Sequence, residues 1–125
     1  MTKRPDTTLM ASWNWELISD KPLDWWLPRI RRIKAEWPDR VIVASIMAGS
    51  GSDKELANWQ VLAEAVQDAG ADAIELNFSC PHMDRVDMGA NVGKDPVLCS
   101  VSTQAVKEVA PYCRSSRVAV VIFRP

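Results

Sequence analysis

The residues best suited to chemistry lie together in residues 77–82, which read Asn-Phe-Ser-Cys-Pro-His. A cysteine thiol with its ordinary pKa of about 8.5 is mostly protonated at neutral pH and can donate a proton. Cys80 carries such a thiol, and the amide of Asn77 and the hydroxyl of Ser79 lie beside it after a predicted strand, where parallel-sheet enzymes hold substrates. Two plainer interpretations stay open, since a cysteine after a strand is most often a small buried side chain and an asparagine there is most often a turn residue.

A metal site is not expected in this segment. His82 is the only histidine of the chain and lies next to Cys80, but no third ligand is evident, so we interpret it as structural. The three cysteines, Cys80, Cys99 and Cys113, lack the C-x-x-C spacing of zinc and iron–sulfur sites. Their odd number and lack of a paired framework are typical of free thiols in a reducing cytoplasm.

Alternating strands and helices must position these side chains. Apolar runs predict strands at residues 41–47, 73–78 and 118–123, the first of them buried on both faces. Between them we expect a helix that Asp53 caps and Gly70 ends, with Leu56, Trp59, Ala63 and Val66 inward, and a second helix from Asp95-Pro96 to about Ala110. This order predicts an α/β fold with a parallel sheet, either an open doubly wound sheet or an arc of a (β/α)8 barrel.

Two further segments precede the first strand. Residues 1–12 are polar and turn-rich, and we expect a loosely held arm. Pro22 occupies the expected first position of a helix that Pro38 ends. The spacing of its apolar residues predicts one buried helical face, formed by Leu23, Trp26, Leu27, Ile30, Ile33 and Trp37. The opposite face, with Arg29, Arg31, Arg32 and Lys34, is expected to be solvated rather than to bind an anion.

Composition excludes several classes of partner. The 125 residues carry a formal net charge of -1, so nothing indicates binding to nucleic acid or to an anionic membrane surface. No run of about 18 apolar residues is present to cross a membrane. The glycines at 49 and 51 do not complete a dinucleotide fingerprint, and Gly93-Lys94 is no phosphate loop. Residues 83–92 are either a lid over a bound ring or a plain surface loop.

Several separated motifs resemble one enzyme family. Residues 75–82 (ELNFSCPH), followed by Met88-Gly89 and by Gly93-x-Asp95-Pro96, resemble the flavin barrel of dihydropyrimidine dehydrogenases and the related dihydroorotate dehydrogenases. Residues 14–21 (NWELISDK) and 43–47 (VASIM) are similar to segments of the dihydropyrimidine branch. The resemblance covers residues 13 to 110.

The resemblance implies a fold, a reaction and a set of roles. It implies an FMN-binding (β/α)8 barrel that moves a hydride between the reduced flavin and C6 of uracil or thymine, as in pyrimidine degradation, while Cys80 exchanges a proton at C5. Asn14 and Asn77 match amides that read the edge of the pyrimidine base, and Ser79 matches either a substrate contact or a local turn-former. NADH or NADPH would supply electrons through another domain or subunit, and a dihydroorotate dehydrogenase of pyrimidine synthesis is the alternative.

Length limits what this chain contributes. A complete barrel takes about 250 residues, so residues 13–125 are expected to form about half of one, without the main FMN-binding segments. Open barrel edges favour self-association or a partner such as an electron-transfer subunit. The alternative is a truncated fragment with no catalytic activity.

Overall fold

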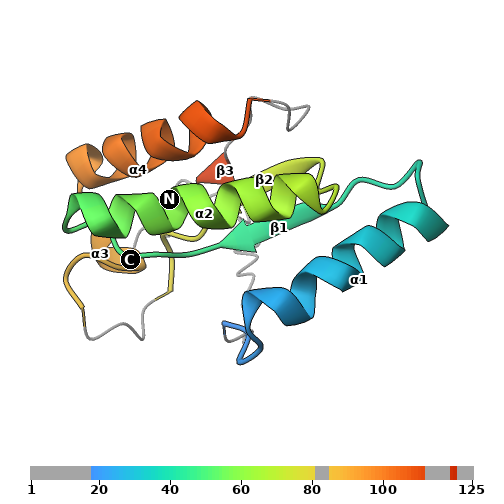
Figure 1. Ribbon diagram of the computed structural model, residues 1–125. Coiled ribbons are helices and arrows are strands. Elements are labelled where there is room, and N and C mark those ends of the chain that lie inside the picture. Colours follow the sequence, from blue (N-terminus) through green and yellow to red (C-terminus); the bar gives the residue numbers. More distant parts are fainter. Residues whose placement is uncertain (1–17, 81–84, 112–118, 121–125) are drawn as a thin grey trace, which may run out of the picture.

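The computed structural model describes residues 18–80, 85–111 and 119–120, and it confirms the α/β class (Figure 1). In chain order the elements are α1 (Leu23–Glu36), β1 (Val43–Ile46), α2 (Asp53–Asp68), β2 (Ala73–Leu76), α3 (Ala90–Gly93), α4 (Pro96–Val109) and β3 (Ala119–Val120). The predicted arm, residues 1–12, lies outside the described residues. In the described part of the chain, no helix is long and apolar enough to cross a membrane.

The strands form one parallel sheet in the order β1-β2-β3, as the alternation of elements predicts. The register pairs Ser45 with Glu75 and Ile46 with Leu76. Each strand is shorter than its apolar run, and of the run at 118–123 only residues 119–120 are described. The carboxyl ends of β1 and β2 therefore lie side by side, and the loops that follow them share one edge of the sheet.

Helices α2 and α4 pack against each other, and α2 also packs on β1 and β2 (Figure 1). Burial in β1 alternates, with Ala44 and Ile46 buried but Val43 55% exposed. The prediction that this strand is buried on both faces is therefore wrong. The reason is that helices cover one face of the sheet, whereas the described residues leave the other face of β1 open.

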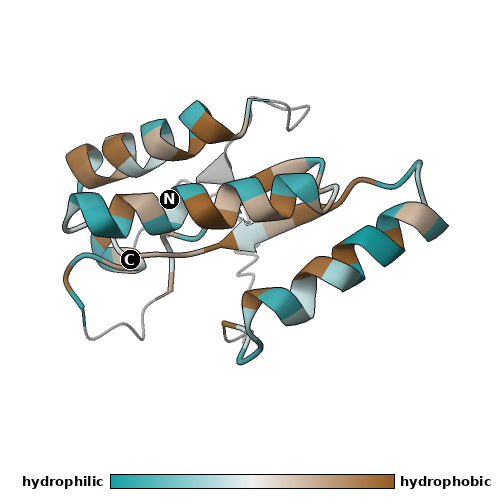
Figure 2. Cartoon of the chain, in the orientation of Figure 1, coloured by the Kyte–Doolittle hydropathy of each residue, from teal (hydrophilic) through white to brown (hydrophobic). Residues whose placement is uncertain are grey.

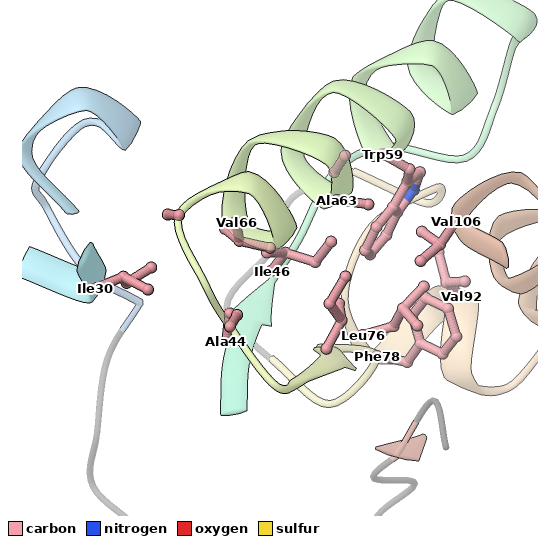
Figure 3. Close-up of a cluster of buried hydrophobic side chains, with 14 residues drawn as sticks. Ile30, Ala44, Ile46, Trp59, Ala63, Val66, Leu76, Phe78, Val92 and Val106 are labelled. Atoms are coloured by element: carbon pink, nitrogen blue, oxygen red, sulfur yellow. The ribbon is translucent and has the colours of Figure 1, made fainter. Parts of the chain in front are cut away.

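The core lies between this sheet and helices α2 and α4 (Figure 3). Its centre is an edge-to-face pair of Trp59 and Phe78, both fully buried, with ring centroids 5.6 Å apart. The indole Nε1 of Trp59 donates to Ser50 Oγ over 3.3 Å, and that hydroxyl lies 2.7 Å from Ser102 Oγ. Since Ser50 follows β1 and Ser102 lies on α4, a satisfied polar contact joins the sheet edge to the helix layer.

Helix ends follow the local chemistry closely. Ser52, one residue before the predicted cap Asp53, caps α2 by accepting from Glu55 N. Gly70 follows α2 with a φ of 100°, the left-handed conformation expected of a glycine that ends a helix. The Asp95 carboxylate caps α4 as predicted, with Pro96 as the first helical residue.

Helix α1 departs most from the sequence expectation. Hydrophobic and hydrophilic residues alternate along it (Figure 2), but of its predicted inner face only Ile30 is buried, while Trp26, Ile33 and Trp37 are exposed. Pro22 is the N-cap rather than the first helical residue. Thus α1 is amphipathic, but little of the described chain packs against its apolar face.

The basic face of α1 is largely solvated, as expected, and one of its residues fastens the helix to the sheet. Lys34 Nζ binds the Asp72 carboxylate at 2.6 Å and donates to the carbonyl of Arg40. The same carboxylate accepts from Ile42 N just before β1. This contact holds α1 at the amino ends of β1 and β2, away from the edge that carries Cys80.

Candidate functional site

The turn that follows β2, residues 77–80, carries the candidate site. Phe78 anchors the turn to the core, because the Phe78 ring is buried against Trp59. The neighbours Asn77 and Ser79 are only partly buried, as side-chain alternation along an extended chain requires. Asn77 N donates to Ile46 O at 2.9 Å, which carries the pairing with β1 one residue beyond the strands. The turn therefore packs directly against the hydrophobic core.

The amide oxygen of Asn77 organises the turn. Asn77 Oδ1 accepts from Ser79 N at 3.1 Å, from Ser79 Oγ at 3.0 Å and from Cys80 N at 3.2 Å. Side-chain oxygens of asparagine commonly close turns in this way. The acceptor end of the amide is thus used locally, whereas Nδ2 has no hydrogen-bond partner among the described residues.

Cys80 has a fixed backbone and a partly exposed side chain. Its N–H is bound by Asn77, and its carbonyl accepts from Ala90 N at 3.0 Å. Cys99 differs, because its Sγ lies 3.1 Å from Val92 O, and burial together with Asp95 raises the pKa of its thiol. Of the two described cysteines, Cys80 alone lies at the carboxyl edge of the sheet.

Three charged side chains that sequence reasoning missed hold the segment beside Cys80, and we call them the Arg85 clamp: Arg85, Asp87 and Glu55. Arg85 Nη2 lies 2.5 Å from Asp87 Oδ2 and 3.0 Å from Glu55 Oε1. Arg85 Nε donates to the other oxygen of Asp87 at 2.9 Å. The Arg85 guanidinium lowers the pKa of the Asp87 carboxyl below its ordinary value. The opposite charges of Arg85 and Asp87, two residues apart, were the sequence signal that could have predicted their ion pair.

Two glycines make room for the clamp. A Cβ on Gly49 would collide with the Glu55 carboxylate, and one on Gly51 would lie 2.8 Å from Asp87 Oδ2. The Gly51 N–H donates to that same oxygen at 3.2 Å. The two carboxylates beside this loop would repel an anion, so the loop does not fit the phosphate of FMN.

Several predicted features remain to be placed. Asn14 and His82 lie outside the described residues, as do residues 83 and 84 of the predicted lid or loop. The described part of that segment is fastened by the Arg85 clamp and by α3, which sequence reasoning did not predict. No group of potential metal ligands occurs in the part of the chain that the structure describes. Asn77, Ser79 and Cys80 are thus the predicted site residues that the structure brings together.

Comparison with known proteins gives consistent names. The chain is 43% identical over 104 residues to the NAD-dependent dihydropyrimidine dehydrogenase subunit PreA of Escherichia coli K12, a match covering 83% of this chain. It is 43% identical over 93 residues to the chloroplastic dihydropyrimidine dehydrogenase (NADP(+)) of Arabidopsis thaliana, covering 74% of this chain. A dihydroorotate dehydrogenase B (NAD(+)) catalytic subunit of Methanosarcina acetivorans is 41% identical over 68 residues, covering 54%.

These matches span 24%, 21% and 20% of the three relatives, so the chain corresponds to a minor part of each. No protein-family profile matches it. The motif around Cys80 and the identity over most of the chain agree, and both point to pyrimidine-related dehydrogenases. Over most of its own length, this chain is homologous to the dihydropyrimidine dehydrogenase subunit PreA of Escherichia coli and the dihydropyrimidine dehydrogenase of Arabidopsis thaliana.

Proposed function

We propose that this chain supplies the proton-donor side of a dihydropyrimidine dehydrogenase, with Cys80 as the catalytic acid. The observation that carries the proposal is the geometry of Cys80, whose backbone is bound on both sides while its side chain stays partly exposed. A general acid needs this combination, because the donor must be held in place and still be accessible to substrate. The names of the homologues support the same chemistry.

In the proposed step, the C5=C6 double bond of uracil or thymine is reduced. A hydride adds at C6, and the Sγ–H bond of Cys80 breaks as its proton forms the new C–H bond at C5. The resulting thiolate recovers a proton from water. Asn77 Nδ2 is the donor end left over from the turn, so it suits a ring carbonyl, and Ser79 holds the turn in shape. Asn14 is proposed as a second amide for the ring edge.

The hydride would come from reduced FMN, recharged by NADH or NADPH through another domain or subunit. Because the loop at Gly49 and Gly51 lies beside two carboxylates, we assign the FMN phosphate to chain segments beyond the described residues. Because these FMN and NADH or NADPH sites would lie elsewhere, we also propose an electron-transfer partner or self-association. This chain's own part is to bind the base and deliver the proton.

We also propose that residues 13–125 form an arc of a (β/α)8 barrel. Three parallel strands follow each other in sheet order, and α2 and α4 lie in one layer. An open doubly wound sheet carries helices on both faces, whereas a barrel carries them outside only. The open face of β1, with Val43 and Ser45, fits the interior of such a barrel. Both Val43 and the β1 edge would then be covered by further barrel strands.

The experiment is a substrate assay on the purified protein supplied with FMN. Because NADH or NADPH would act through another domain or subunit, the FMN is reduced chemically under anaerobic conditions, and uracil or thymine should then reoxidise it in the presence of the protein. Oxidation of dihydroorotate in place of pyrimidine reduction would favour the dihydroorotate dehydrogenases, which the Methanosarcina relative represents. A protein without either activity would favour the non-catalytic fragment and refute the proposal.

A further inference from the structure

The segment that returns to Cys80 is anchored at the carboxyl ends of two strands. Asp87 provides the link to β1, because its carbonyl accepts from Ser50 N at 2.9 Å and its carboxylate accepts from Gly51 N at 3.2 Å. Ala90 provides the link to β2, because its N–H donates to Cys80 O at 3.0 Å. Residues 87–90 therefore bridge the two loops that follow β1 and β2.

Arg85, whose side chain is 50% exposed, connects this bridge to the helix layer by ion pairs. Its guanidinium binds Asp87 and, through the same Nη2, Glu55 in the first turn of α2. The carbonyl of Arg85 in turn accepts from Asn91 Nδ2 at 3.0 Å. Planar guanidinium groups engage two carboxylates at fixed angles, which a lysine ammonium cannot copy. The Arg85 side chain thus sets the position of Asp87 relative to α2.

Helix α3 also supports residues 87–90 by packing. A Cβ on Gly93 would collide with the Phe78 carbonyl, so α3 lies directly against the turn that holds Cys80. Val92 of the same short helix is fully buried. Movement of residues 85–89 is therefore passed to the Cys80 backbone through Ala90, and the buried α3 gives that bridge a rigid support.

We propose that Arg85, together with Asp87 and Glu55, is a positioning residue that fixes the distance of the Cys80 thiol from its substrate. The inference rests on the proposed function, because that function makes Cys80 the acid that must be positioned. Arg85 itself does not contact the reacting atoms. It acts through Asp87, Ala90 and the carbonyl of Cys80.

The first test measures Cys80 itself and needs no enzymatic activity. Arg85→Gln, Arg85→Lys and Asp87→Asn are compared with the parent chain by iodoacetamide alkylation, followed by peptide mapping of the Cys80 peptide. Loosening the bridge should raise the alkylation rate about threefold or more in Arg85→Gln, with Arg85→Lys in between. The matched control is Arg32→Gln, which breaks the exposed ion pair of Arg32 with Glu36 on α1 and should leave the rate unchanged.

The second test measures turnover of pyrimidine. Arg85→Gln should lower kcat about tenfold, because a displaced acid protonates C5 poorly, while KM for uracil changes little. Unchanged alkylation and unchanged kcat in both Arg85→Gln and Asp87→Asn, with native far-UV circular dichroism, would overturn the inference. Full turnover in Cys80→Ala would instead refute the proposed function, and the alkylation rates would still decide whether the clamp positions the turn.

Discussion

Truncation of Phe78 is expected to destabilise the core on which the candidate site is built. The Phe78→Ala substitution removes a ring that is 1% exposed and that meets Trp59 edge to face at 5.6 Å. Transfer of that ring from water is worth about 2–3 kcal/mol. The cavity raises the total cost to about 3–5 kcal/mol, of which the aromatic pair contributes roughly 1 kcal/mol. We expect a loss of about 4 kcal/mol in the free energy of unfolding.

Urea denaturation followed by tryptophan fluorescence and by far-UV circular dichroism measures this loss. Phe78→Leu keeps most of the volume and should cost about half as much. Val97→Ala is the control, because Val97 is 68% exposed and its truncation should change stability by less than about 0.5 kcal/mol. Because Cys80 follows Phe78 by two residues in the same turn, Phe78→Ala should also speed alkylation of Cys80. A cost below about 1 kcal/mol would refute the packing argument.

Three further outcomes follow from the described contacts. At pH 8, iodoacetamide should label Cys80 faster than Cys99, whose thiol pKa is raised by burial and by Asp95, and equal rates by peptide mapping would contradict this. The Asp87 carboxyl has its pKa lowered by Arg85, so it stabilises the fold above its ordinary pKa of 3.8, and that contribution is lost as the pH falls through the lowered value. Asp87→Asn should therefore flatten the fall in urea midpoint between pH 5 and 3, whereas a curve as steep as that of the exposed control Asp68→Asn would exclude the effect. Gly93→Ala should lower the thermal midpoint by several degrees, because its Cβ meets the Phe78 carbonyl, and a midpoint unchanged from that of the parent chain would show that α3 can move aside.

Local signals predicted the elements of this fold well. Asp95 and Pro96 start α4, Gly70 ends the turn after α2, and the spacing of Trp59, Ala63 and Val66 defines the buried face of α2. These features depend on neighbouring residues and backbone geometry, so the sequence displays them directly.

Burial was harder to predict, because it depends on what lies opposite. The apolar residues of β1 and α1 are the same whether or not a neighbour covers them, and in the described chain Val43, Ile33 and Trp37 stay exposed. Periodicity reports which residues can be buried together rather than whether a partner is present.

In the candidate site, too, the local features were predictable from the sequence and the long-range contacts were not. The motif at 77–82 located the turn, and the turn-forming tendency of asparagine was visible in Asn77. The Arg85 clamp joins residues 30 positions apart along the chain, Glu55 and Arg85, and no spacing rule connects them. Contacts of this length become visible only once the parallel sheet has brought the loops after β1 and β2 together.

Turnover of uracil by Cys80→Ala decides whether Cys80 donates the proton to C5. The assay is uracil-dependent reoxidation of chemically reduced FMN in the presence of the protein under anaerobic conditions, with Cys99→Ala as the matched cysteine control. Cys80→Ala is expected to lower kcat by roughly 100-fold to 10,000-fold, the contribution of a general acid, while Cys99→Ala keeps its turnover. Equal turnover in Cys80→Ala and the parent protein would contradict the assignment of Cys80 as the proton donor.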